Sequence, residues 1–310
     1  MAKVPHWLPS VISTDYAIPL RAQGHNLDEI MDVISRALAE DLDGGVDVTT
    51  SATIAPTHKS IMELRARKDG VVAGGTVAAA VFDLVSQSEA NIQIEVADGM
   101  PVKAGDVIVQ IVGPTYALLT AERTALNILC HLSGIATATN AWVKELTGTN
   151  TKIRDTRKTT PGLRKLEKYA VVCGGGTNHR MSLADAALVK DNHIVAAGGV
   201  VQAFEAVRRK FAEISVEVEV DSLDQLQEVV AAGADLVLLD NFSVEEVKRA
   251  VELNAGRAKL EASGGLTLDV ARSYAETGVD YLAVGGITHS APILDIGADL
   301  QTLNSESDGV

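Results

Sequence analysis

A run of basic residues interrupts an otherwise acidic chain. Between residues 152 and 190, nine lysines and arginines accompany three acidic residues, so this segment carries +6 while the rest of the 310-residue chain carries −20. Arg157 and Lys158 stand out, because they follow an apparent short strand and precede the loop-forming residues 159–162. Cations concentrated inside an acidic protein are typical of an anion site, so we expect carboxylates or phosphates to bind here.

Further polar residues follow in the same segment. Gly174-Gly-Gly-Thr-Asn-His-Arg180 offers three glycines whose backbone N–H groups can converge on an anion, with His179 as a donor and Arg180 as a planar fork. Lys190-Asp-Asn-His193 forms a charged cluster at the next apparent strand end, where His193 by itself is more often structural than catalytic. We interpret the basic residues at helical spacing, with their acidic neighbour, as a solvated face: Arg164, Lys165, Lys168 and Glu167.

Two carboxylates end successive strand patterns. Glu219 and Asp240 would share one rim of a parallel sheet with the basic cluster, and Mg²⁺ prefers one or two carboxylates together with substrate phosphate oxygens. We therefore expect a magnesium site there. The neighbouring Asp221 and Asn241 are expected to cap the following helices or to pair with a lysine.

The second half of the chain repeats a strand-helix unit. Apolar strands ending near Glu219, Asp240, Glu261 and Ala283 recur every 21 or 22 residues, which predicts parallel strands with right-handed crossovers. An open doubly wound sheet and a closed barrel both satisfy this pattern. We favour a β/α barrel because polar or glycine residues follow strand after strand, and because pairs of glycines after the last two strands can form a phosphate cradle. Only six or seven strands can be counted, so the barrel is expected to be incomplete.

The first half predicts a small α+β, sandwich-like domain. An amphipathic helix follows the N-cap residue Asn26, and short strands alternate with turns until a largely helical stretch at 116–146, which we expect to break into two packed helices at Ser133-Gly134. The expected strands and the helix between them are Ile61 to Ala66, Ile92 to Val96, Val107 to Val112 and a helix from about Thr76. The predicted domains are 26–147 for this part, 148–292 for the barrel, and a C-terminal segment 293–310 that packs back on the first domain.

Composition excludes several classes of function. The net charge of −14 disfavours nucleic acid and anionic membranes as partners, and no apolar run is long enough to span a bilayer. The N-terminal stretch lacks the uninterrupted apolar core of a signal peptide, so we expect a cytoplasmic protein. Cys130 and Cys173 are too few for a disulfide framework and are expected to be buried.

Taken together, the motifs resemble the quinolinate phosphoribosyltransferase family (nicotinate-nucleotide pyrophosphorylase, carboxylating), which consists of type II phosphoribosyltransferases. The similarity runs from about Leu27 to Leu300. The motifs that carry it, in chain order, are Glu122-Arg-Thr-Ala-Leu-Asn127, Ser133-Gly-Ile-Ala-Thr137, Lys152-Ile-Arg-Asp-Thr-Arg-Lys-Thr159, Gly174 to Arg180, Lys190 to His193, Glu219-Val-Asp221, Leu239-Asp-Asn241, Glu261-Ala-Ser-Gly-Gly265 and Val284-Gly-Gly286.

The resemblance implies a pentosyltransferase of de novo NAD synthesis. Quinolinate and phosphoribosyl pyrophosphate (PRPP) would give nicotinate mononucleotide, pyrophosphate and CO₂, with Mg²⁺ and without an organic cofactor, in a homodimer whose subunits share active sites. The implied quinolinate ligands are Arg157, His179, Arg180 and Lys190, with Arg123 from the partner chain. The implied PRPP ligands are Lys158, Lys190, Glu219, Asp240, Ser263, Gly264, Gly265, Gly285, Gly286 and His289. The implied catalytic residues are Lys158, Lys190, Glu219 and Asp240, of which Glu219 and Asp240 would also bind the metal.

Two kinds of alternative remain open at this point. A paralogous type II pyrophosphorylase or a nicotinate phosphoribosyltransferase would share the architecture, although the pairing of Arg157 with Arg180 favours a dicarboxylate substrate. A biotinyl or lipoyl carrier module is a distant alternative, because residues 98–106 resemble the turn of such a domain but no modifiable lysine hairpin is evident.

Overall fold

The computed structural model describes residues 5–303, which form two compact units. Unit 1 consists of residues 5–137, 161–174 and 291–303, and unit 2 of residues 138–160 and 175–290. Residues 138–147, which we expected in the first domain, lie in unit 2, and residues 161–174, which we expected in the barrel, lie in unit 1. Residues 1–4 of the N-terminal stretch and residues 304–310 of the expected C-terminal segment lie outside the described residues.

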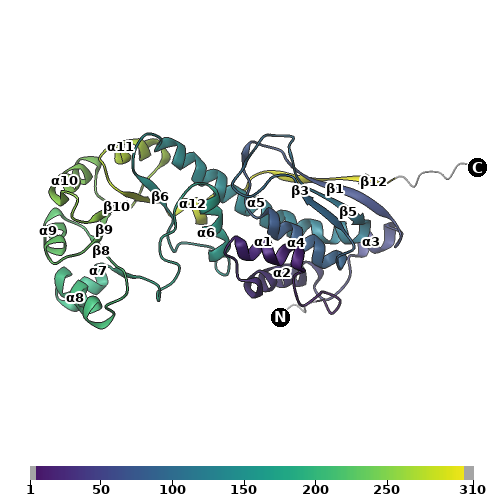
Figure 1. The fold of residues 1–310 in the computed structure, drawn as a ribbon, viewed down its shortest axis with the longest axis horizontal. Coiled ribbons are helices and arrows are strands. Elements are labelled where there is room, and N and C mark those ends of the chain that lie inside the picture. Colours follow the sequence, from purple (N-terminus) through teal and green to yellow (C-terminus); the bar gives the residue numbers. More distant parts are fainter. Residues whose placement is uncertain (1–4, 304–310) are drawn as a thin grey trace, which may run out of the picture. The chain divides into compact units, whose positions relative to one another are not determined.

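Unit 1 is built on an antiparallel sheet of four strands in the order β12-β1-β5-β3 (Figure 1). Successive residues of β1 alternate between its buried and less buried faces, as expected for a strand covered on one side. The strand β12 pairs with β1 from Ser60 to Ala66, so residues 296–302 return to the sheet of the first domain. The strands are β1 (Lys59–Ala66), β3 (Asn91–Ile94), β5 (Val107–Pro114) and β12 (Ile296–Thr302), with a separate pair β2 (Gly70–Val71) and β4 (Pro101–Val102).

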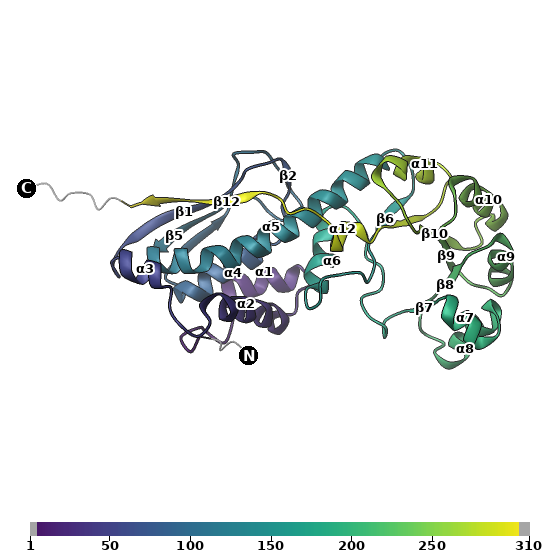
Figure 2. The ribbon, with the colours of Figure 1, turned by 180° about the vertical axis from the view of Figure 1, so that it is seen from behind.

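Helices cover this sheet. All twelve residues of α4 (Gly75–Ser86) are buried where it packs against β3 and β5, and α1 (Thr14–Ala22) packs on α4 (Figure 2). The sequence pattern missed α1 because Pro19 lies inside it. The helix after Asn26 is confirmed as α2 (Leu27–Leu42), whose first N–H groups donate to the Asn26 side chain. A short helix, α3 (Val48–Thr53), follows it.

The long helix α5 (Thr115–Glu145) is continuous, so the expected break into two helices is wrong. Ser133 and Gly134 allow close packing instead of ending the helix. The Ser133 hydroxyl exchanges hydrogen bonds with the backbone of Ala73 (3.1 and 3.2 Å), and a Cβ on Gly134 would lie only 2.2 Å from the Pro292 carbonyl oxygen. The absence of a side chain at Gly134 therefore lets the chain returning toward β12 lie directly against the helix.

The helix α6 (Arg164–Cys173) contributes buried charges to unit 1. Glu167 and Lys168 are fully buried, so their interpretation as part of a solvated face is wrong. The Glu167 carboxylate lies 2.9 Å from His131 Nε2 on α5, which fastens α6 to unit 1. Cys173 is only partly buried, contrary to expectation, although burial raises the pKa of its thiol to about 11.

Unit 2 contains six parallel strands in the order β6-β11-β10-β9-β8-β7, flanked by helices. Since β6 and β7 are edge strands, the sheet is the predicted incomplete barrel. The strands are β6 (Lys152–Arg154), β7 (Ala187–Val189), β8 (Val216–Val220), β9 (Leu236–Asp240), β10 (Lys259–Ser263) and β11 (Tyr281–Ala283). The helices are α7 (Asp191–Ala197), α8 (Val200–Lys210), α9 (Leu223–Ala231), α10 (Val244–Asn254), η1 (Leu268–Val270), α11 (Ala271–Ala275) and α12 (Gly286–His289). None of the described helices has the length and apolar character that crossing a bilayer requires.

Replacing Gly134 by alanine should destabilise the protein by about 1–3 kcal/mol, because the new methyl group meets backbone atoms that cannot rotate away. This loss outweighs the gain of about 1 kcal/mol in helix propensity. Denaturant unfolding measures the change. Asn127→Ala, at an exposed position of the same helix, is the matched control and should leave stability unchanged or slightly raised. A Gly134→Ala protein as stable as the wild type would refute the close-packing role.

Candidate active site

One face of the unit 2 sheet carries most of the polar residues singled out above. Register places Asp240 beside Ser263 and Ser263 beside Ala283, which in turn pairs with Arg154. Paired residues of neighbouring parallel strands point to the same side, so these strand ends present one continuous polar surface. The alternation of β8 brings Glu219 to this face as well.

Two arginines lie near each other in unit 2. Arg157 follows β6, and Arg180 precedes β7 and donates from Nη1 to the Ala186 carbonyl (3.1 Å). Burial, and after it repulsion by Arg157, lower the pKa of the Arg180 guanidinium. The structure therefore brings together two cations that repel each other, which is the electrostatic situation that a bound anion relieves.

His179 is held by protein groups on three sides. Its backbone N–H donates to Asp155 Oδ1 (2.7 Å), its Nδ1 accepts from the Arg180 N–H (2.6 Å), and its Nε2 lies 2.7 Å from Glu217 Oε2. This last pair is an electrostatic contact rather than an aligned hydrogen bond, since both carboxylate oxygens of Glu217 lack a hydrogen-bond partner among the described residues. Both ring nitrogens face protein groups, so the contact of His179 with a substrate carboxylate that the resemblance implies would require the ring to leave one of them.

Behind this histidine lies a buried charge cluster that the sequence analysis did not assign. Arg154 Nη1 lies 2.6 Å from Glu261 Oε2 and 4.0 Å from Glu217 Oε1, and Glu261 Oε1 lies 3.6 Å from His179 Nε2. Burial, together with the neighbouring Glu217 charge, raises the pKa of Glu261 to about 7. The sequence contains a signal for this cluster, because charged residues alternate along the two strands. Glu217 lies on the same face of β8 as Glu219, and Arg154 lies on the same face of β6 as Lys152.

The expected metal ligands are only partly available. The Glu219 carboxylate accepts a hydrogen bond from Lys190 Nζ, and Asp240 Oδ2 accepts one from Asn241 Nδ2 (2.8 Å). Among the described residues, the group of three side chains close enough to hold an ion is instead His179, Glu217 and Glu261. Glu219 and Asp240 therefore offer at most two carboxylates, one of them already paired with a lysine.

The expected PRPP-binding loops have distinct local geometries. Gly264 has φ +98°, and a Cβ there would lie 2.1 Å from Asn241 Oδ1, so a side chain is excluded. A Cβ on Gly285 would lie 3.1 Å from Lys158 Cδ and 3.2 Å from His289 Nε2. The structure thus gathers Lys158 and His289 around Gly285. The helices that follow the glycine pairs have three and four residues, so helix dipoles contribute little here.

Other local expectations need correction. Gly174 ends α6, and its N–H donates to the Ala170 carbonyl (3.0 Å) rather than being directed at an anion. The helices after β8 and β9 are capped by Ser222 and Ser243 rather than by Asp221 or Asn241. His193 has the expected structural role, since its Nδ1 accepts a hydrogen bond from the Lys190 N–H (3.0 Å).

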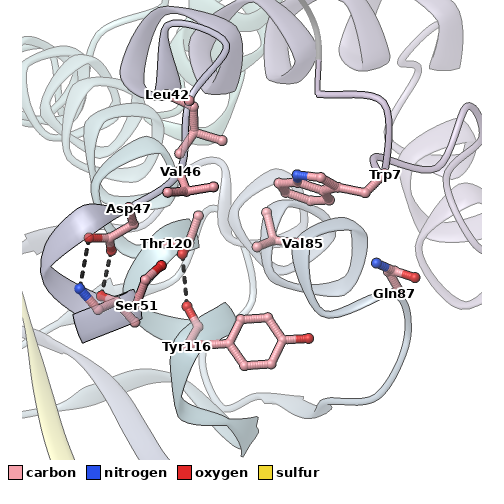
Figure 3. A pocket seen from close by; sticks show the side chains of 11 residues that line it. Trp7, Leu42, Val46, Asp47, Ser51, Val85, Gln87, Tyr116 and Thr120 are labelled. Carbon is pink, nitrogen blue, oxygen red and sulfur yellow. Dashed lines mark hydrogen bonds between the residues drawn. The ribbon is translucent and has the colours of Figure 1, made fainter. Parts of the chain in front are cut away.

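Arg123 belongs to unit 1, where it is exposed on α5. Unit 1 also contains a partly open cavity of about 210 Å³ bordered by Trp7, Val46 and Tyr116 (Figure 3). Its one carboxylate, Asp47, already accepts the Thr50 N–H (2.9 Å) at the start of α3. No predicted site residue lines this cavity, so we assign it no part in the chemistry.

Comparison with known proteins identifies the family of this chain. The models of the N-terminal and C-terminal domains of quinolinate phosphoribosyl transferase match residues 47–133 and 135–299. Nicotinate-nucleotide pyrophosphorylase [carboxylating] of Mycobacterium leprae is 50% identical over 88% of this chain and 98% of its own, and the probable enzyme of that name from Bacillus subtilis is 40% identical over 90% and 96%. The crystal structure of NadC from Streptococcus pyogenes superposes with a TM-score of 0.86 at 41% identity, covering 90% of this chain and 99% of that one. The chain therefore belongs to the quinolinate phosphoribosyl transferase family.

Proposed function

We propose that this protein transfers the phosphoribosyl group of PRPP to quinolinate and releases CO₂ and pyrophosphate, giving nicotinate mononucleotide for NAD synthesis. The observation that supports this most strongly within the site is the approach of Arg157 to Arg180, because two neighbouring cations match the two carboxylates of quinolinate. The single carboxylate of nicotinate would match only one of these two cations. Family membership also favours the quinolinate reaction over that alternative and over a carrier module.

The chemistry needs positioning and charge compensation. The pyridine nitrogen attacks the anomeric carbon of PRPP, and pyrophosphate leaves with the electron pair of the broken C–O bond. In this proposal Lys158 and Lys190 offset charge on the departing group, while carboxylates such as Asp240 stabilise the oxocarbenium character of the ribose.

Decarboxylation follows from the same bond formation. Once alkylated, the ring nitrogen is cationic and stabilises the electron pair left on the adjacent carbon when CO₂ departs. A proton then takes up that pair to give nicotinate mononucleotide. Because the substrate itself supplies the electron sink, we expect no organic cofactor.

We further propose that Mg²⁺ binds together with PRPP. Glu219 and Asp240 fit an ion that shares its coordination with substrate oxygens, since two carboxylates suffice for Mg²⁺ when phosphates complete its shell. When bound, the ion would neutralise charge on the pyrophosphate.

The proposed assembly is a homodimer with shared active sites in the cytoplasm. The family resemblance assigns Arg123 to the quinolinate pocket of the partner chain, and its exposure on α5 leaves it accessible to one. The free thiols of Cys130 and Cys173 suit a reducing compartment.

Quinolinate should be turned over and nicotinate should not. With one carboxylate missing, the substrate loses a charge-assisted hydrogen bond to one of the two half-buried arginines, which costs about 1–3 kcal/mol and further disfavours the transition state. Incubation with PRPP and Mg²⁺, with quantification of CO₂ and nicotinate mononucleotide, tests this. Turnover of nicotinate at a comparable rate would contradict the proposed substrate.

Replacing Asp240 by asparagine or Glu219 by glutamine should raise the Mg²⁺ concentration needed for half-maximal rate by roughly tenfold, since each change removes a charged oxygen ligand. Quinolinate affinity without PRPP should stay within about twofold of wild type for Asp240→Asn. Calorimetric titration provides that comparison. Loss of quinolinate binding with unchanged magnesium dependence would show that Asp240 has another role.

Mixing Arg123→Ala chains with Arg157→Ala chains should restore activity. Each parent loses a charge-assisted hydrogen bond, worth about 1.5–3 kcal/mol or roughly ten- to a hundredfold in affinity. A mixed dimer carries both lesions in one site and neither in the other, so about half of its sites should work. Lys144→Ala, at an exposed position on the same helix as Arg123, should be fully active alone. If mixed dimers form without recovered activity, Arg123 serves its own subunit.

A further inference from the structure

We propose that Glu217 is a positioning residue for substrate carboxylate binding: it holds the ring of His179, and through that ring it fixes Arg180 in the anion site. The inference rests on the proposed quinolinate function, since it names the residue that prepares the quinolinate pocket. Glu217 is not expected to touch quinolinate. Only 2% of its surface is exposed, and a carboxylate in direct contact with a dicarboxylate would repel it.

The contacts form a continuous chain. Glu217 Oε2 lies 2.7 Å from His179 Nε2, and His179 Nδ1 accepts the backbone N–H of Arg180 (2.6 Å). Because Nδ1 accepts this hydrogen bond, a neutral ring carries its hydrogen on Nε2, which faces Glu217. The ring therefore bridges a buried strand residue to the backbone of the arginine that we assign to quinolinate. Asp155, which accepts the His179 N–H (2.7 Å), fixes the same segment from the end of β6.

Charge balance favours this role over a metal site. His179, Glu217 and Glu261 present atoms within 4.8 Å of one another, as a metal site would. However, Arg154 Nη1 already lies 2.6 Å from Glu261 and 4.0 Å from Glu217 and partly balances their charge. A divalent ion would add positive charge next to a partly buried guanidinium. A histidine in contact with Glu217 completes the group without that penalty.

Two near-isosteric substitutions separate positioning from general stability. Glu217→Met keeps the side-chain volume but removes the oxygen acceptor, whereas Glu217→Gln keeps an amide oxygen that can accept from His179 Nε2. We expect Glu217→Met to raise the Kd and KM for quinolinate at least tenfold, with KM for PRPP within twofold. Glu217→Gln should stay within about threefold of wild type for all three constants. Glu276→Ala, which breaks an exposed contact with Arg272 (2.7 Å), is the control and should leave every constant unchanged.

A spectroscopic measurement on wild-type protein keeps the test independent of mutant folding. Ring ¹⁵N spectra should show His179 protonated on Nε2 and not on Nδ1 near neutral pH, with the same pattern after quinolinate is added. The proposal would be overturned if Glu217→Met and Glu217→Gln weakened quinolinate binding equally, or if the substitutions lowered kcat alone. Transfer of the His179 contact from Glu217 to quinolinate would also overturn it. A stoichiometric metal that disappears in Glu217→Met would do the same. Failure of the wild type to bind quinolinate would instead refute the proposed function.

Discussion

Two arginines that repel each other define the chemistry of unit 2. Arg157 follows β6 and Arg180 precedes β7, and these two strands are the opposite edges of the sheet. The two side chains still lie close enough for the charge of Arg157 to contribute, after burial, to the lowered pKa of Arg180. A fold retains such a pair only when other contacts fix both side chains or when a ligand offsets the repulsion. Much of the geometry described here fixes the Arg180 side: the Ala186 carbonyl holds its guanidinium, and the His179 ring holds its backbone.

The buried cluster beside His179 holds two carboxylates. Glu217 and Glu261 are buried between strands, and Arg154 balances part of their charge. Burial, and after it the neighbouring Glu217 charge, raise the pKa of Glu261 to about 7, so this carboxyl is partly protonated near neutral pH. At the surface of the same face, Glu219 is paired with Lys190, so two residues expected to bind the same substrate are already adjacent.

The sequence predicted the repeating strands well because parallel strands in a β/α barrel read as apolar runs at nearly constant spacing. It also located the polar strand ends, including Ser263 and Asp240, which register places side by side. It failed where a residue's role depends on a distant partner. Gly134 was taken for a helix break because the close approach of Pro292 cannot be seen from the local pattern.

The same limitation affected the buried charges. Lys168 was predicted to be exposed because helical spacing does not indicate which element packs over a residue. Glu219 was selected as a site residue, whereas Glu217, two residues away on the same face, was not. Gly174 was assigned to an anion loop, whereas its N–H is used to end a helix.

The central claim is that Arg157 and Arg180 bind the two carboxylates while His179 stays with the protein. The crystal structure of the protein with quinolinate bound tests it most directly. The account predicts each guanidinium at about 2.7–2.9 Å from a carboxylate oxygen, with His179 Nε2 still on Glu217. A complex in which His179 has left Glu217 to contact the ligand, or in which either arginine lies away from it, would contradict the account.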